Sequence, residues 1–182
     1  TKAKQLADMV IVLPHWGTEY VYTPDSNQNY WTQLFLSLGV DVVIGTHPHV
    51  LEPVEVVSDT KGHEMLVYYS LGNFVSNQDQ KPRMIGGMAK MTLVKDETGC
   101  YVKNYNLTPV ITQKLFGKKA ITTYKLSDYT ESLASGNAIR NDSGCSDFSL
   151  SYCQTLIKQI LGDDYDESTS ELNVSLHPDG LV

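Results

Sequence analysis

Two short runs of β-branched residues, with one helical segment between them, most constrain how this chain can fold. Residues 7–13 and 40–44 are rich in Val and Ile, which is typical of strands covered on both faces in a parallel or mixed sheet. The segment between them, at about residues 27–38, has the apolar spacing of a helix. Strand, helix and strand in this order predict a βαβ unit and therefore an α/β fold.

The predicted helix is bounded by residues that commonly start and end helices. Asp25 or Ser26 precedes it and can accept the free N–H groups of the first turn, and Gly39 suits the position just after the last turn. Its apolar side chains predict the face that packs on the sheet: Tyr30, Trp31, Leu34, Phe35 and Leu38.

Both predicted strands end in loops that contain histidine. His15 follows the first strand, and His47 and His49 follow the second. The carboxyl ends of parallel strands meet at the edge where open α/β sheets bind ligands. Because neutral imidazole is a common ligand of divalent metals, these three are candidate metal ligands; the alternative is that each satisfies a local backbone group. His63 and His177 are expected to be exposed, in a turn and in the tail.

Other side chains near these loops have both functional and structural interpretations. Glu19 is a candidate general acid–base, a partner of a ligating histidine or a substrate contact, and alternatively an exposed carboxylate. Trp16 either stacks on a flat ligand or walls the crevice as a core residue. Asn73 suits a backbone turn, and its amide is also a candidate to point into the crevice. Tyr20 lies in the same loop as Glu19.

Two β-hairpins are predicted after the second histidine loop. Residues 54–58 and 65–70 form the first, and residues 89–95 and 101–107 form the second, each around a polar turn. Both have the strand-like composition and the turn residues that hairpins need.

The carboxyl-terminal third carries weaker signals. Residues 114–147 are polar and irregular, and a closing helix is predicted over residues 148–161, capped by Asp147 or Ser146. The acidic segment 162–171 predicts a solvated loop or a fraying tail.

Composition excludes several classes of protein. The formal net charge of −7 argues against nucleic-acid binding. The content of 41% apolar and 19% charged residues is typical of a soluble globular domain. The apolar runs are far shorter than the roughly 18 residues that a membrane span needs.

Of the three cysteines, Cys145 and Cys153 could pair in an exported protein, with Cys100 buried and free.

Three histidines without a nearby aspartate are an incomplete set of ligands for a two-metal hydrolytic centre. Such centres usually include carboxylates, one of which bridges the ions. Asp8 begins the first predicted strand and Asp41 lies inside the second, so both are away from the histidine loops. If the site is binuclear, this sequence supplies only part of it.

Three segments together resemble a known family. They are His-Trp-Gly-Thr-Glu-Tyr at residues 15–20, Gly-Val-Asp-Val-Val-Ile-Gly-Thr-His-Pro-His-Val at residues 39–50, and Tyr-Ser-Leu-Gly-Asn-Phe-Val at residues 69–75. In this order and spacing they resemble the capsule synthesis protein CapA (poly-γ-glutamate biosynthesis, PgsA-like) family. That family is placed in the calcineurin-like metallophosphoesterase superfamily, whose fold is an α/β/β/α sandwich.

The resemblance implies that this chain is the carboxyl-terminal half of such a protein. Residues 1–112 are then the CapA-like domain half, and residues 113–182 are an extension with a closing helix and an acidic tail. The resemblance places a Gly-Asp element and an Asn-Asn-His element in the family's other half; this sequence has no Asn-Asn-His, and no Gly-Asp precedes its histidine loops. The expected fold is a mixed β-sheet sandwich with flanking helices, inactive alone, whose exposed sheet edge pairs with a second copy or the missing half.

The function that the resemblance implies is metal-dependent hydrolysis of a phosphoester or of a capsule polymer, either poly-γ-glutamate or polysaccharide. The alternative is a non-catalytic component that handles the polymer together with the capsule export machinery. The intact site would hold two divalent ions, Mn, Fe or Zn, and the full-length protein would be tethered at the cell surface. The implied roles are metal binding by His15, His47 and His49, catalysis by Glu19, and substrate binding by Trp16, Tyr20 and Asn73.

Overall fold

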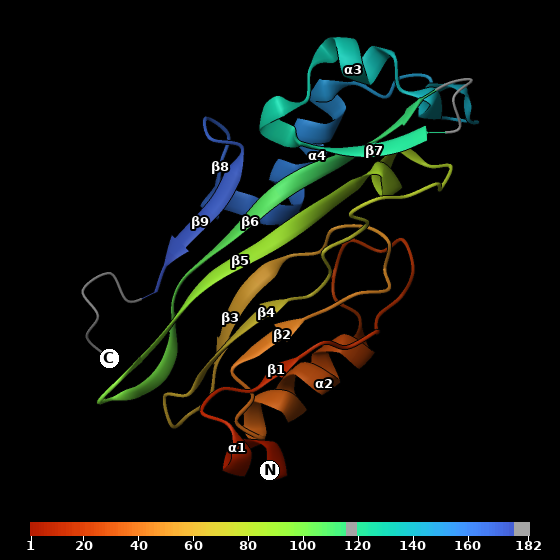
Figure 1. The fold of residues 1–182 in the computed structure, drawn as a ribbon. Coiled ribbons are helices and arrows are strands. Elements are labelled where there is room, and N and C mark those ends of the chain that lie inside the picture. The colour runs from red at the N-terminus through yellow and green to blue at the C-terminus, as the bar shows by residue number, and fades with distance from the viewer. Residues whose placement is uncertain (116–119, 177–182) are drawn as a thin grey trace.

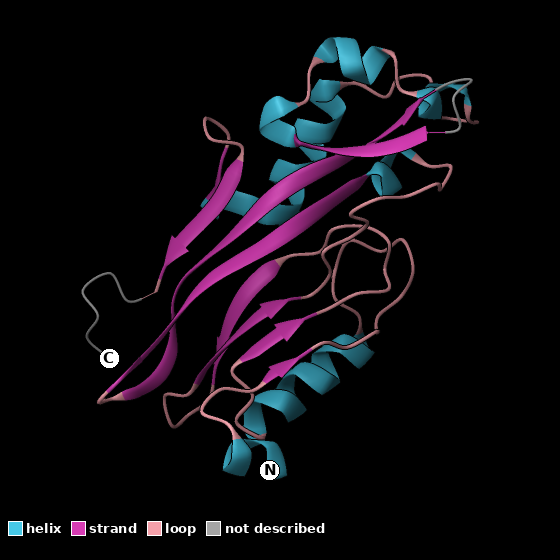
Figure 2. Ribbon diagram, in the orientation of Figure 1, coloured by secondary structure: helices cyan, strands magenta, loops and turns pink. Residues whose placement is uncertain are grey.

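The computed structural model describes residues 1–115 and 120–176 and contains two β-sheets with helices beside them (Figures 1 and 2). A four-stranded sheet has the order β1-β2-β4-β3, and a five-stranded sheet has the order β5-β6-β9-β8, with β7 beside β6. The mixed α/β sandwich predicted from the sequence is confirmed.

The four-stranded sheet contains the predicted βαβ unit. Its strands are β1 (Ile11–Val12), β2 (Val42–Ile44), β3 (Val54–Ser58) and β4 (Glu64–Tyr68). β1, β2 and β4 run parallel, and β3 pairs antiparallel with β4 as the first predicted hairpin. The helix α2 (Ser26–Ser37) connects β1 to β2.

β2 lies in the middle of the apolar core because both of its faces are covered. Neighbouring residues of a strand point to opposite faces. Val42 lies in the core between the two sheets, and Val43 lies in a second core beneath α2. On β4 the Tyr68 ring faces the second sheet, with its centroid 6.3 Å from the Tyr105 ring, and its hydroxyl donates to Asn106 O at 3.0 Å.

The five-stranded sheet is built on a long hairpin. Its strands are β5 (Ile85–Asp96), β6 (Gly99–Leu115), β7 (Ala120–Lys125), β8 (Tyr165–Asp166) and β9 (Glu171–Ser175). The second predicted hairpin is confirmed as part of β5 and β6, which are longer than predicted and carry a bulge between Thr92 and Leu93.

The other helices are short except for one. They are α1 (Lys2–Leu6), α3 (Glu131–Ser135) and α4 (Leu150–Leu161), with 3₁₀ turns at Lys81–Met84, Leu126–Asp128, Ala138–Asn141 and Gly162–Asp164. The closing helix is confirmed as α4, but its cap is Ser149, whose hydroxyl accepts the N–H of Tyr152 at 3.1 Å. Within the described residues, no helix has the length and apolarity to cross a membrane.

The face of α2 that packs on the sheet differs from the predicted one. Its buried residues are Gln28, Thr32 and Leu36, whereas Tyr30 and Trp31 are exposed. The physical reason lies at the start of the helix, where the Gln28 side chain bonds both to the capping residue and to a buried carboxylate. These bonds fix the rotation of the helix, so most of the predicted aromatic stripe faces outward.

Two further predictions about chain ends are corrected by the structure. β1 is not covered on both faces, since it is an edge strand of the sheet and Ile11 is 42% exposed.

The acidic segment is not a fraying tail. It forms the β8–β9 hairpin on the edge of β6, because Tyr165 and Leu172 bury their side chains in the core.

The remaining expectations concern histidine, cysteine and domain organisation. His63 is half-buried rather than exposed, with Nε2 2.8 Å from Val40 O, and His177 lies outside the described residues. All three cysteines are free; Cys100 is only half-buried, and the other two are buried in the core. The predicted domain boundary at residue 112 falls inside β6, and the division into two parts stays a prediction.

Candidate functional site

The two histidine loops lie side by side because their strands are neighbours. β1 and β2 pair in parallel, and the pairing continues beyond the strands as a bridge between His15 and Thr46. Trp16 donates its backbone N–H to Thr46 O at 3.0 Å, and Thr46 donates its own to Pro14 O at 3.0 Å. The carboxyl ends of the two strands therefore hold both loops at one edge, as the strand order predicts.

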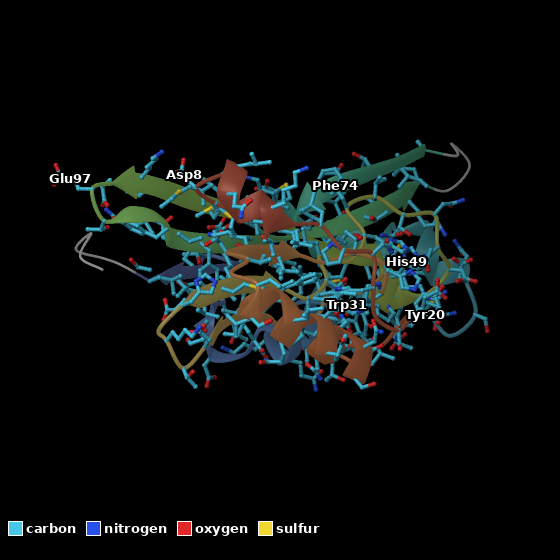
Figure 3. The ribbon with its side chains drawn as sticks, turned by 90° about the horizontal axis from the view of Figure 1, so that it is seen from below. Asp8, Tyr20, Trp31, His49, Phe74 and Glu97 are labelled. Carbon is cyan, nitrogen blue, oxygen red and sulfur yellow. The ribbon has the colours of Figure 1, made fainter. Side chains whose placement is uncertain are left out.

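The predicted catalytic residue and two predicted metal ligands converge on one point. Glu19, His47 and His49 each offer one ligand atom, and these atoms all lie within 4.8 Å of one another. His49 Nε2 is 3.7 Å from Glu19 Oε1. His15 is not one of these three residues, but its ring lies beside the group, with its centroid 4.5 Å from that of His47. Figure 3 places Tyr20 at the same end of the molecule as His49.

The backbone of this cluster is held in an unfavourable conformation. Tyr20, His47 and His49 have φ angles of 68°, 108° and 61°, and they are three of the four described non-glycine residues with positive φ. Such conformations persist only where surrounding contacts enforce them, and they concentrate at functional sites. One such contact joins the two loops: the Tyr20 N–H donates to Pro48 O at 2.8 Å.

Asn73 fixes which nitrogen of His49 is free. The Asn73 side-chain Nδ2 donates to His49 O at 3.1 Å and to Arg83 O at 3.0 Å, so the orientation of the amide is set by two carbonyls. Its Oδ1 lies 3.0 Å from His49 Nδ1 and accepts that N–H. In the neutral ring the lone pair is then on Nε2, which lies 3.7 Å from Glu19 Oε1, and this is the arrangement that a metal ligand needs.

Replacing Asn73 with alanine is expected to release the His49 ring. The His49 carbonyl and the Arg83 carbonyl each lose a donor, so the free energy of unfolding should fall by about 1–3 kcal/mol. The His49 tautomer, followed by long-range ¹H–¹⁵N NMR, should change from one form to a mixture. Asn73→Asp is the comparison, because it keeps the acceptor for Nδ1–H. An unchanged tautomer in Asn73→Ala would contradict this role.

Trp16 and Tyr20, both predicted substrate contacts, lie in different surroundings. Trp16 is 6% exposed, and its indole N–H donates to Tyr69 O at 2.8 Å within the core beneath α2. This burial favours the core alternative for Trp16. Tyr20 is 39% exposed, and its ring centroid lies 6.1 Å from that of His49, where a ligand can reach it.

The donor atoms of the cluster suit a borderline divalent metal. Imidazole nitrogen and carboxylate oxygen are ligands that Zn, Fe and Mn accept. Two ligands of one tetrahedral zinc, each at about 2.0–2.1 Å, lie roughly 3.3 Å apart, close to the 3.7 Å between His49 and Glu19. Within residues 1–115 and 120–176, no aspartate joins this group, so the shortage of carboxylates expected from the sequence persists.

A buried carboxylate behind the loops was not expected from the sequence. Glu52 is fully buried, its Oε2 accepts from Gln28 Nε2 at 2.6 Å, and its Oε1 has no partner. Burial raises the pKa of Glu52 to about 7. The sequence signal that could have pointed to the Gln28 side chain is its spacing from Asp25, because these two residues form a capping box at the start of α2.

Arg83 is a second residue near the cluster that sequence reasoning missed. It lies in the 3₁₀ turn after β4, and its guanidinium carbon is 3.6 Å from the centroid of the Tyr20 ring. Tyr20 and Arg83 are far apart in the chain, and no local pattern predicts that they meet.

Comparison with known proteins shows that the region of this site is similar to a bacterial family. The family model described as bacterial capsule synthesis protein PGA_cap matches residues 1–78. The PGA biosynthesis protein CapA of Bacillus subtilis is 36% identical over 110 residues, covering 60% of this chain and 27% of the relative. The capsule biosynthesis protein CapA of Bacillus anthracis is 39% identical over 72 residues, covering 40% of this chain and 16% of the relative.

The matched regions have two consequences for the site. The chain spans about a quarter of the length of the Bacillus subtilis relative, so this site is compared with one part of a longer protein. The family match includes every site residue predicted from the sequence, from His15 to Asn73. Residues 1–78 of this chain thus match the bacterial capsule synthesis protein family, and the resemblance to CapA proteins seen in the sequence is confirmed.

Proposed function

We propose that the histidine cluster is a divalent metal site of a hydrolase in capsule biosynthesis, which acts on a phosphoester or on the capsule polymer. The observation that carries the proposal is the convergence of Glu19, His47 and His49, with His49 Nε2 3.7 Å from the Glu19 carboxylate. The family supports the capsule setting, since both relatives are named for capsule or PGA biosynthesis. The cell surface is the location proposed with it.

In this proposal His47 and His49 hold the metal, and His15 completes the nitrogen ligands through its position beside His47. A bound divalent ion lowers the pKa of its water and supplies hydroxide near neutral pH. Glu19 is half-exposed, so its carboxylate can either bind the metal or take a proton from the attacking water. The exposed part of Tyr20 lies beside the cluster, where substrate would contact it.

The carboxylates of a two-metal centre would come from another segment of the whole protein. Two observations support this part of the proposal. The described residues bring no aspartate to the cluster. The matched region covers 27% of the Bacillus subtilis relative, which leaves ample length for further ligands. The two ions, Mn, Fe or Zn, would then be shared between this chain and that segment.

A non-catalytic role in handling the polymer is the second candidate. It is favoured by a hollow of about 710 Å³ on the polar face of the second sheet, away from the histidines. Asn104 and Asn106 of β6 and Asn173 of β9 line it, with Lys90 and Lys125 at its sides. Amide and ammonium groups of this kind can hydrogen-bond a polar polymer.

Metal binding tests the site on which the first candidate rests. The double variant His47→Ala/His49→Ala is expected to weaken zinc binding by a factor on the order of 100 or more, because two ligands are lost. Binding is measured by isothermal titration and by elemental analysis of the purified chain. His63→Ala is the matched control, since that histidine lies in the β3–β4 turn and should leave binding unchanged.

The outcome for the whole protein decides between hydrolysis and polymer handling. Turnover of an aryl phosphate or of capsule polymer that disappears in the double variant would support the hydrolase. Equal metal content in the wild-type chain and the double variant would contradict the metal site. Metal binding without any turnover would favour the second candidate.

A further inference from the structure

The strongest remaining feature is the position of Arg83 beside the histidine cluster. Its guanidinium carbon lies 3.6 Å from the centroid of the Tyr20 ring, which is close enough for a strong cation–π contact. The Tyr20 ring is stacked beside His49, with 28° between the two planes. Arg83 is therefore one aromatic ring away from a proposed metal ligand.

Arg83 is also tied to His49 through its backbone. The Asn73 amide donates to Arg83 O at 3.0 Å, and its oxygen accepts from His49 Nδ1 at 3.0 Å. Gly86 holds this turn close to the loop of Asn73, because a Cβ at Gly86 would lie 2.2 Å from Asn73 O. The main chain of Arg83 is thus held by Asn73, and its side chain is held by the Tyr20 ring.

Much of the hydrogen-bonding capacity of Arg83 is unused. Nη1 donates to Asp79 Oδ1 at 2.9 Å, while Nε is buried without a partner. Within the described residues, no hydrogen bond engages Nη2. Nε–H and Nη2–H form one edge of the guanidinium, and two parallel donors at this edge match the two oxygens of a phosphate or carboxylate.

The charges around this edge favour an anion. The side chain of Arg83 is only 20% exposed, whereas its one partner, Asp79, is 70% exposed and hydrated. Surface ion pairs of this kind are weak, so Asp79 does little to neutralise the guanidinium. Arg83 thus carries a half-buried positive charge, one ring away from the cluster, with two donors that no described residue engages.

We propose that Arg83 forms an oxoanion subsite beside the histidine cluster, which binds a phosphate or carboxylate group of the substrate through its Nε and Nη2 donors. This inference rests on the proposed function, because it takes the cluster as the place where the substrate reacts. Tyr20 holds the guanidinium on one side through its ring. The alternative is a structural role, in which Arg83 only joins its turn to the Tyr20 loop.

The test is anion binding by the metal-free chain. Inorganic phosphate and acetate are titrated separately while the side-chain Nε–H resonance of Arg83 is followed by NMR. Phosphate is expected to shift this resonance in a saturable way, and a matching shift with acetate would identify the subsite as open to carboxylates. Arg140 is the only other arginine in the sequence, so its Nε–H signal is an internal control that should stay unshifted.

Variants distinguish recognition from structure. Arg83→Gln is expected to weaken phosphate binding at least about 10-fold, because two charge-assisted hydrogen bonds are lost. Arg83→Lys keeps the charge and the contact with Tyr20 but lacks the paired donors, so its affinity should be intermediate. Lys81→Gln is the matched control, since Lys81 lies in the same turn and pairs with Asp147.

The outcomes also separate this inference from the proposed function. Zinc binding in Arg83→Gln should equal that of the wild-type chain, whereas His47→Ala/His49→Ala should lose zinc and keep phosphate binding. If both variants keep zinc binding, the metal site is contradicted, but the oxoanion subsite is not. A phosphate shift no larger at Arg83 than at Arg140, or equal phosphate affinity in Arg83→Gln and wild type, would overturn the oxoanion subsite.

Discussion

Replacement of Gly45 by alanine is expected to destabilise this chain more than any other single methyl group added near the site. A Cβ at Gly45 would lie 2.0 Å from Tyr69 O and 2.3 Å from Trp16 Nε1. These two atoms form a buried hydrogen bond of 2.8 Å, so the new methyl group would lie between its donor and its acceptor. The backbone cannot move away, since the Gly45 N–H donates to Tyr68 O at 2.7 Å.

The expected loss follows from two effects. Overpacking in a tight core costs about 1–3 kcal/mol, and the broken buried hydrogen bond costs about 1–3 kcal/mol more. For a chain of this length each kcal/mol lowers Tm by about 2–4 °C, so a fall on the order of 10 °C is expected. Because Trp16 follows His15 and Gly45 precedes the second loop, both histidine loops should shift as well.

The control for this prediction is Gly136→Ala. At Gly136 the nearest atom to a new Cβ is Ser132 O at 3.4 Å, and φ is −87°, which alanine adopts readily. Its effect on the free energy of unfolding should stay within about 1 kcal/mol. Thermal unfolding followed by circular dichroism measures both variants. Equal Tm values for Gly45→Ala and the wild-type chain would show that the space around Gly45 is less tight than the structure has it.

The parts of the fold that follow from local signals could be predicted. The run at β2 is β-branched and unbroken because both faces are buried, so its composition alone identifies a central strand. The ends of α2 are marked by Asp25 and Gly39, each of which satisfies a local backbone requirement. The meeting of His15 with His47 then follows from parallel strands that end at one edge.

The parts that depend on distant partners could not be predicted. The helical spacing of apolar residues predicted that Tyr30 and Trp31 face the core, but the bond of Gln28 to Glu52 turns α2 so that they face outward. That bond joins residues that are 24 positions apart, and one of them is a carboxylate that usually lies at the surface.

The β8–β9 hairpin could not be predicted for a different reason, which is that its apolar pattern is too weak. Each strand contributes one buried apolar side chain, Tyr165 or Leu172, in a segment whose acidic residues are mostly exposed. Because the strands are short, one apolar residue in each is too weak a pattern to outweigh the charge of the segment. The pairing with β6 supplies the missing stabilisation, and this pairing is invisible in the local sequence.

Glu52 should make the stability of the chain depend on pH in an unusual direction. Burial raises the pKa of this carboxyl from about 4.5 to about 7 in the folded chain. Between these two values the folded chain holds a proton that the unfolded chain releases. The free energy of unfolding therefore falls as pH rises from about 4.5 to about 7, by about 3 kcal/mol in total, and then stays level with respect to this group.

Glu52→Gln is expected to remove this contribution. A neutral amide still offers an oxygen to Gln28 Nε2, but it does not ionise as pH rises. The wild-type chain and the variant should have similar free energies of unfolding at pH 4.5. At pH 7.5 the variant should be more stable than the wild type by about 3 kcal/mol. Urea unfolding at several pH values measures the difference.

The comparison between variants is needed because other groups also titrate in this range. Glu97→Gln is the control: Glu97 lies in the exposed turn between β5 and β6 (Figure 3), where removing a charge changes the free energy of unfolding by less than about 0.5 kcal/mol. If the curves of wild type and Glu52→Gln run parallel from pH 4.5 to 7.5, Glu52 is ionised in the folded chain. The Gln28 amide would then donate to a buried negative charge. The cost of desolvating that charge would have to be offset by a group other than Gln28.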